Sequence, residues 1–460
     1  MTERLARAVT TPLLYLFIVG DVLGAGIYVL IGQIAGVSGS AVWVPLVVAL
    51  VLAMLTAASY AELATKYPRA GGAAHYTQRA FGPFAGFVVG FCMLAAGVVS
   101  VAALARGFGG DYLGEFVDLP PVLVIAVFLV MLAALNARGI KDSLRANVVA
   151  TLIEAGGLVL VIGLGFWVIG RGDAEPARLV ELGTAEKGPI AGVLAGVVLA
   201  YYSFVGFETS VNVAEETKDP RRSYPRALFG AMATAGLLYL LVGVVASAVV
   251  PASRLAGSSG PLLEVVRVAG GVPTWVFGVI ALVAVANGAL LTGIMSSRLA
   301  YGMARDRLLP AVLTKVLPRR RTPWVAIVVT TGISLGLALT GDIAVLASTL
   351  VLLLLIVFAA VNTAVLVLRK DKSAPSHFRA PSAIPVLGLV SCVLLATQVE
   401  PAVWLRGGAL VAIAVLFAVV HAVATRRRAG HHDEAPARAQ EGLDRFETSL
   451  GSRDGDETGA

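Results

Sequence analysis

Three acidic side chains lie inside stretches that are otherwise apolar: Asp21, Glu154 and Glu208. An unpaired charge at the centre of a membrane helix costs about 2.5 to 3.5 kcal/mol on insertion scales, so such residues are candidates for function. Asn147, Thr151 and Glu154 are spaced four and three apart, which places them on one helix face. We predict that Glu154 binds and releases a proton. Sodium coordination by these oxygen donors and a static hydrogen bond to a neighbouring helix are the alternatives.

A cluster of small residues interrupts the first apolar stretch at Gly24, Ala25 and Gly26, followed by Ile27. The two glycines would let a helix open and expose backbone N–H groups at its positive end, which is a receptor for a carboxylate. Close helix packing through small residues is the alternative interpretation. The nearby Asp21 either hydrogen-bonds the freed backbone or takes part in ion coupling directly.

A second interruption reads Tyr201-Tyr202-Ser203-Phe204-Val205-Gly206-Phe207-Glu208, where aromatic residues surround a glycine and a carboxylate follows. A membrane helix that buries its backbone hydrogen bonds should avoid such clusters unless exposed backbone serves a purpose. Glu208 stands beside this break as Asp21 stands beside the first, with the same two candidate roles. For the aromatics, ordinary packing is the alternative to a role at a binding site.

The elements that position these residues are apolar helices. The chain has 460 residues, of which 57% are hydrophobic and 14% charged, whereas soluble domains carry about 25% charged residues. Runs of this composition are long enough to cross a hydrocarbon layer roughly 30 Å thick. We therefore predict an all-α protein of the lipid bilayer with about twelve transmembrane helices, near residues 12–36, 40–65, 84–110, 121–137, 146–170, 190–214, 227–250, 273–303, 323–341, 343–368, 383–400 and 403–425.

We expect these helices to form two halves of five, residues 12–170 and 190–368, followed by two additional helices in 383–425. An odd number of helices per half inverts the second half relative to the first. The two interruptions then fall in helices 1 and 6, which begin the halves, and that arrangement points to a binding site near the midplane. Residues 1–11 form a cytoplasmic N-terminus, and the polar segment 429–460 is predicted to be a disordered cytoplasmic tail.

Charge distribution predicts the orientation. Segments that lie inside when the N-terminus is cytoplasmic hold 25 lysines and arginines, against seven in outside loops. This asymmetry places both termini in the cytoplasm and the 171–189 loop outside. The net charge of +7 therefore reports orientation, and nucleic-acid binding is not needed to explain it. Cys92 and Cys392 are far apart in apolar runs, and we expect no metal site and no cofactor.

At the two interruptions the sequence resembles the amino acid-polyamine-organocation superfamily, whose members share the LeuT-type fold. Gly24 to Ile27 match the family pattern G-[SAT]-G-I, and Phe204 to Glu208 match aromatic-x-G-F-[DE]. Three further stretches agree: Tyr67-Pro68-Arg69-Ala70-Gly71-Gly72, Glu215-Glu216-Thr217-Lys218-Asp219-Pro220 with Pro225, and Ser297-Arg298 through Met303-Ala304-Arg305-Asp306 to Pro310. The likeness covers about residues 10–425.

The resemblance implies roles for the residues at both breaks. The substrate carboxylate would meet backbone amides of Gly24, Ala25, Gly26 and Ile27. The amine would meet carbonyls of Phe204, Val205 and Gly206, with Phe204 or Tyr202 as an aromatic gate.

Two positions depart from relatives. Ala96 stands where some relatives that prefer cationic substrates carry an acid, and Glu154 stands where many proton-coupled relatives carry a lysine.

The function these features favour is secondary transport of an amino acid by alternating access, with proton symport in the cell membrane. High Ala, Gly and Arg content suggests a bacterial source. Within transport, the alternatives are a sodium-coupled carrier and an exchanger of amino acids or polyamines. A membrane-embedded enzyme predicts clustered His, Asp or Ser at one membrane face, and a sensor predicts a folded output domain. The sequence has neither feature, so we do not expect an enzyme.

Overall fold

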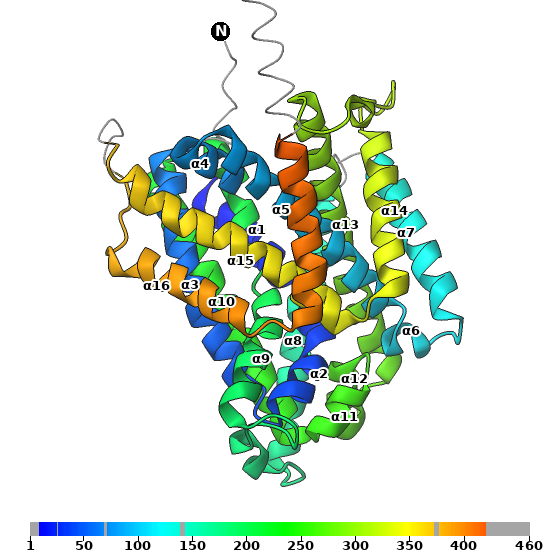
Figure 1. Cartoon of the computed structure of the whole chain (residues 1–460). Helices are drawn as coiled ribbons and strands as arrows, with labels where there is room; N and C mark the ends of the chain where they lie inside the picture. The colour runs from blue at the N-terminus through cyan, green and yellow to red at the C-terminus, as the bar shows by residue number, and fades with distance from the viewer. Residues whose placement is uncertain (1–8, 25, 69–70, 139–142, 372–376, 420–460) are drawn as a thin grey trace, which may run out of the picture.

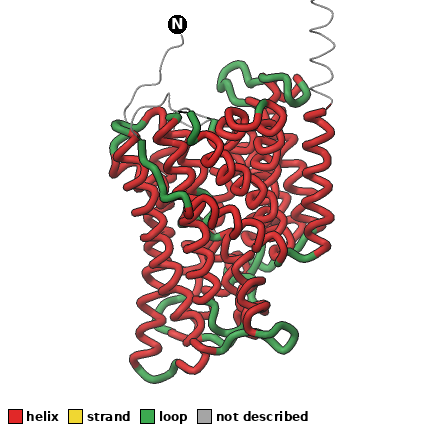
Figure 2. Tube along the Cα trace, turned by 60° about the vertical axis from the view of Figure 1, so that its left-hand side comes forward, coloured by secondary structure: helices red, strands yellow, loops and turns green. Residues whose placement is uncertain are grey.

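Helices make up nearly all of the computed structural model, which describes residues 9–24, 26–68, 71–138, 143–371 and 377–419. Within that part of the chain every regular element is helical (Figure 2). Of the predicted terminal segments, residues 1–8 of the segment 1–11 and all of 429–460 lie outside the described residues, as does Ala25. The all-α prediction is confirmed.

Eight helices of the described chain are long and apolar enough to cross a membrane, and a bent pair adds a ninth. The eight are α3 (Trp43–Lys66), α5 (Pro83–Phe108, continued by α6, Asp111–Gly114), α7 (Pro121–Arg138), α8 (Ser143–Gly170), α10 (Pro220–Val249), α13 (Thr274–Arg305), α15 (Ile343–Leu368) and the helix Pro401–Val419. The bent pair is α1 (Thr11–Val22) and α2 (Gly26–Ser38), which meet at 43°.

Three shorter apolar helices coincide with the remaining predicted spans: α9 (Pro189–Tyr202), α14 (Trp324–Thr340) and α16 (Ala383–Thr397). Their 14, 17 and 15 residues fall below the roughly 20 that a straight crossing needs. The multi-pass architecture is therefore established, and the count of twelve stays a prediction.

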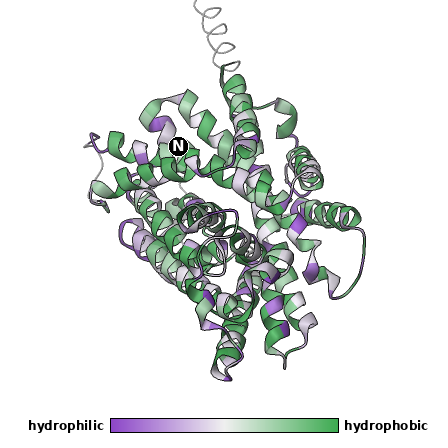
Figure 3. Ribbon diagram, turned by 60° about the horizontal axis from the view of Figure 1, so that its bottom comes forward, coloured by the Kyte–Doolittle hydropathy of each residue, from purple (hydrophilic) through white to green (hydrophobic). Residues whose placement is uncertain are grey.

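Apolar side chains cover the outside of the bundle. Val130 on α7, Trp167 on α8 and Leu405 on the last helix are 64%, 63% and 77% exposed. Large apolar surface of this extent is costly in water and stable against lipid tails. Figure 3 shows hydrophobic residues along most of the helical surface, with hydrophilic residues mainly near loops and helix ends.

Short helices connect the long ones at both ends of the bundle: α4 (Gly72–Phe81), α11 (Ala252–Gly257), α12 (Pro261–Ala269) and the 3-10 turns η1 (Pro176–Val180) and η3 (Ala311–Thr314). In Figure 1, α4 lies at the end where the chain begins, whereas α11 and α12 lie at the opposite end. The arginine-rich start of α10 is hydrogen-bonded to the start of α1, and it lies with the end of α13 at the first of these two ends (Figure 1). Basic segments that the charge distribution predicts to be cytoplasmic therefore lie together at one end of the bundle.

A buried ion pair joins helices at the same end of the bundle. The Glu62 carboxylate of α3 is 1% exposed and accepts two hydrogen bonds from Arg369, at 2.8 and 2.6 Å, and one from the Ala380 amide at 3.0 Å. The hydrogen bonds from the Arg369 guanidinium to Glu62 raise the pKa of Arg369 above its ordinary value. Such fork geometry fixes α3 against the end of α15 and the segment before α16.

Candidate functional site

The two interrupted helices meet at their breaks. A Cβ atom built on Gly26, the first residue of α2, would lie 3.0 Å from the Ser203 Cα and 3.1 Å from the Tyr202 ring, just past the end of α9. A Cβ on Gly206 would lie 2.5 Å from the Asp21 carbonyl oxygen, and Gly206 has a φ of 128°. Glycine is required there on both counts, since no side chain fits and L-residues rarely adopt that φ.

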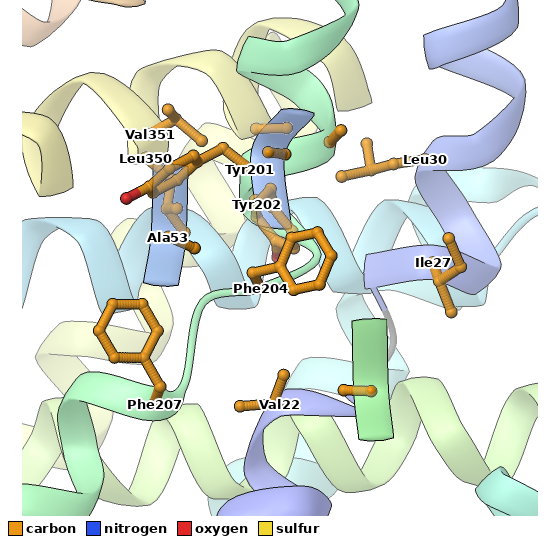
Figure 4. Close-up of a cluster of buried hydrophobic side chains, with 14 of the residues drawn as sticks. Val22, Ile27, Leu30, Ala53, Tyr201, Tyr202, Phe204, Phe207, Leu350 and Val351 are labelled. Carbon is orange, nitrogen blue, oxygen red and sulfur yellow. The ribbon is translucent and has the colours of Figure 1, made fainter. Parts of the chain in front are cut away.

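After the break the chain continues as the 3-10 helix η2 (Phe207–Glu216) and then as α10. The tight turns of the break satisfy the last carbonyls of α9, because the amides of Ser203, Phe204 and Val205 donate to Ala200, Tyr201 and Tyr202 at 3.0 to 3.1 Å. In Figure 4 this turn passes between Tyr202 and Val22, the last residue of α1.

One acidic side chain from each interrupted helix forms a hydrogen bond at the break of helix 6. Glu208 is 3% exposed and accepts a hydrogen bond from the Gly206 amide at 2.9 Å. The Thr209 hydroxyl bonds the Asp21 carboxylate and also lies 2.9 Å from the Gly206 carbonyl oxygen. Both acids therefore contact the opened region of helix 6, and Asp21 does so from helix 1.

Backbone and hydroxyl bonds tie α1 to the segment after η2 and to α10. Val9 and Thr217 form an isolated parallel bridge, with the Lys218 amide donating to the Val9 carbonyl at 2.8 Å. Thr11 donates to Ser223 at 2.8 Å, and the Tyr15 and Thr234 hydroxyls lie 2.8 Å apart. The start of helix 1 is thereby fastened along the helix that follows helix 6.

A cavity of about 430 Å³ opens beside the breaks. Its walls come from α1, α2, the 203–209 segment, α5, α8, α13 and α15, and they are mostly apolar, with Met93, Ala96, Leu104, Leu350 and Leu354 among them. A volume of this order fits one small solute with some water.

Most of the predicted residues line this cavity, and four do not. Those that line it are Asp21, Gly24, Gly26, Asn147, Tyr202, Val205, Gly206 and Glu208. Ile27 and Phe204 are fully buried away from it, and Phe204 packs on Tyr239 with ring centroids 5.3 Å apart. Of the two predicted gate residues, Tyr202 faces the cavity and Phe204 lies behind it. Thr151 and Glu154 also lie outside its lining.

Glu154 on α8 is fully buried, and neither of its carboxylate oxygens has a hydrogen-bond partner among the described residues. The Tyr28 hydroxyl bonds the backbone carbonyl of Glu154 at 2.6 Å and not the side chain. Thr151, one turn earlier, also has an unpartnered hydroxyl within the described chain, and it packs against Gly20, whose Cβ would lie 2.5 Å from it. Asn147 is paired, since its amide oxygen accepts from Asn287 at 3.0 Å.

Sequence reasoning missed several cavity residues. Ser100 on α5 lies 2.9 Å from the Tyr202 hydroxyl, hydroxyl to hydroxyl. Arg298 on α13 lines the cavity, and its Nη1 is buried without a partner in the described part of the chain. The sequence offered one signal for Arg298, a basic residue within an apolar run. It offered no signal that Ser100 would line the cavity.

Comparison with known proteins gives the following matches. The family model for amino acid permeases matches residues 10–423. An uncharacterised transporter of Mycobacterium tuberculosis is 33% identical over 414 residues, covering 89% of this chain and 90% of the relative. The branched-chain amino acid permease of Bacillus subtilis is 28% identical over 425 residues, covering 85% and 89%. The vacuolar cationic amino acid transporter 4 of Arabidopsis thaliana is 30% identical over 398 residues, covering 80% and 64%.

Proposed function

Because the chain belongs to the amino acid permease family of the amino acid-polyamine-organocation superfamily, we propose that it carries a neutral amino acid across the cell membrane together with a proton. The observation that carries this proposal is the meeting of two interrupted helices at one wall of a cavity of about 430 Å³.

Backbone groups at the two breaks suit the two ends of an amino acid. The first four N–H groups of an α-helix have no acceptor inside the helix, and α2 begins at Gly26 in the cavity wall. This positive helix end receives the substrate carboxylate. On the other break, the carbonyls of Phe204 and Val205 receive the amine, because the carbonyls of Ala200 to Tyr202 before them and of Gly206 after them already accept hydrogen bonds.

The cavity wall argues for a neutral substrate side chain. Ala96 supplies no negative charge where a cationic side chain would need one, and Arg298 adds a positive charge to the wall. The two acids in the wall, Glu208 and Asp21, already accept hydrogen bonds from the Gly206 amide and the Thr209 hydroxyl. The methionine and leucine side chains of α5, α13 and α15 favour an aliphatic side chain. The name of the branched-chain permease relative agrees with this preference, and the name of the cationic transporter does not.

Glu154 is the proposed proton site. Burial of an ionised carboxylate without a partner is costly, so this residue carries a proton while it is enclosed as described here. Water or a new partner reaching it in another conformation would allow the proton to leave. Proton uptake and release would then follow the conformational cycle.

A thermal-shift series on the detergent-solubilised protein tests the substrate assignment. A ligand at 100 times its dissociation constant stabilises by about 2.7 kcal/mol. Leucine should stabilise the protein, whereas lysine and leucine methyl ester should not, because the first adds a charge beside Arg298 and the second lacks the carboxylate. Equal stabilisation by the ester and the free acid would exclude the assigned carboxylate contact.

A further inference from the structure

A basic hollow lies away from the central cavity, where α10 begins. It has a volume of about 900 Å³, and Arg221, Arg222 and Arg226 line it together with Asp219. All three arginines are exposed, and none forms an ion pair or a side-chain hydrogen bond within the described chain. The hollow therefore holds more positive than negative charge, and its guanidinium groups are free to bind an anion.

An apolar groove continues from this hollow. It has a volume of about 650 Å³ and runs between α3, α10 and α16. Phe229 and Phe378 line both the hollow and the groove, and their ring centroids lie 5.8 Å apart. Below them the wall is entirely apolar and includes Val51 and Leu237, which are 54% and 57% exposed.

We propose that the hollow and the groove together bind one anionic phospholipid. Arginine pairs with phosphate through a planar fork of N–H donors, and basic pockets at the cytoplasmic face recognise anionic headgroups. The hollow lies at the arginine-rich end of the bundle, which charge asymmetry assigns to the cytoplasm. An acyl chain fills the groove because the groove faces the hydrocarbon region, where lipid tails are the available solvent.

The membrane orientation of the protein already explains why basic residues gather at the cytoplasmic end. The proposal therefore depends on the convergence of Arg221, Arg222 and Arg226 on one hollow. Three other exposed basic residues, Arg305 at the end of α13 and Lys315 and Arg319 in the segment that follows it, line neither the hollow nor the groove. They make a matched control, since removing them subtracts the same charge from the same end of the protein.

Phosphatidylglycerol binding to the purified full-length chain, measured by thermal shift and by native mass spectrometry in detergent, tests the site. The triple variant Arg221→Gln, Arg222→Gln, Arg226→Gln should bind about 100-fold more weakly, from about 1 kcal/mol for each arginine. The triple variant Arg305→Gln, Lys315→Gln, Arg319→Gln should change binding less than about threefold, because none of these three residues lines the hollow or the groove. Equal losses in both triples would overturn the proposal in favour of nonspecific charge attraction.

The groove gives a second, independent test. Ala233→Trp fills it from an exposed position on α10, and this variant should lose phosphatidylglycerol while keeping its unliganded melting temperature. Inorganic phosphate should not stabilise the wild type, because it has no chain for the groove. Unchanged lipid binding by Ala233→Trp, or equal stabilisation by phosphate, would refute a lipid site.

The acidic C-terminal segment is the competing occupant. A chain that lacks residues 429–460 should bind phosphatidylglycerol as the full chain does. Lipid binding that appears only after this deletion would overturn the proposal and assign the basic hollow to the chain's own tail.

Discussion

The acids at the helix breaks and the acid on α8 differ in their hydrogen-bond partners. Glu208 and Glu154 are both buried, at 3% and 0% exposed, and Asp21 is partly buried. Glu208 is bonded to the Gly206 amide and Asp21 to the Thr209 hydroxyl, whereas Glu154 has no side-chain partner among the described residues. A carboxylate bonded to backbone and hydroxyl donors has its charge compensated where it stands. A carboxylate without donors does not, so it is the one that must change its protonation or its surroundings.

The contrast assigns two different roles: the acids at the breaks maintain the shape of the binding site, and the acid on α8 couples transport to an ion. Removing an acid at a break should weaken the opened helices themselves, so every transport mode suffers together. Removing the acid on α8 should leave the opened helices intact and affect only the driving force. Four predictions test the contrast, in decreasing order of the expected effect.

The largest effect is expected at Gly206. Gly206→Leu should abolish uptake, because its Cβ would lie 2.5 Å from the Asp21 carbonyl oxygen at a φ of 128°. Strain of this kind costs about 1 to 3 kcal/mol. Gly26→Val should also abolish uptake, because its side chain would press on Ser203 and fill part of the cavity. Gly302→Ala on α13 is the control, since a Cβ there meets nothing within 4 Å. Radiolabelled uptake in proteoliposomes checks all three, and normal transport by either site variant would show that the breaks are wrongly assigned.

Glu154→Gln should exchange substrate at close to the wild-type rate and lose accumulation driven by a pH gradient. Glutamine keeps the size of the protonated acid and cannot release a proton. Wild-type uptake should rise as the outside pH falls, because the carrier loads protons together with substrate. Counterflow and pH-jump uptake in the same proteoliposomes separate the two modes. Accumulation by Glu154→Gln that still follows the pH gradient would eliminate the proton role, and a wild-type requirement for sodium would favour sodium coordination instead.

Glu208→Gln and Asp21→Asn should lower exchange and accumulation together. Each weakens a charge-assisted hydrogen bond at a break, and such bonds contribute about 1.5 to 3 kcal/mol. The melting temperature without substrate should fall for both variants and stay near the wild-type value for Glu154→Gln. If Glu208→Gln lost only pH-driven accumulation, the distinction between the two kinds of acid would be wrong.

The smallest effect is expected for Tyr202→Phe. This variant loses the 2.9 Å contact with the Ser100 hydroxyl, and one hydrogen bond contributes about 0.5 to 1.5 kcal/mol. The melting temperature should fall only slightly, by what one such bond contributes, and the KM should rise about threefold to tenfold because the Tyr202 ring is no longer fixed in the cavity wall. Phe204→Ala should instead destabilise the protein by about 3 to 5 kcal/mol, because it empties a fully buried position. A KM effect at Phe204 without destabilisation would reverse the assignment of which aromatic faces the substrate.

Sequence reasoning located most long helices because hydrophobic runs of membrane length leave a strong local signal. It also located both breaks, since glycines in an apolar run are a local feature. It missed α4, α11 and α12, which are short and lie in connecting segments. The choice between Tyr202 and Phe204 was out of reach, because both stand in the same turn and only tertiary packing decides which one faces the cavity. The bond from Thr209 to Asp21 joins residues 188 positions apart, and no sequence pattern marks it.

The bridge between Val9 and Thr217 has a mechanical consequence. Together with the bonds from Thr11 and Tyr15 to α10, it joins α1 and α10 into one rigid unit. Such a unit rotates about the breaks as a whole, so α1 cannot move without α10. Spin labels on α1 and α10 should therefore keep one fixed separation while both move relative to α5, and both helices should report the same opening rate and the same closing rate.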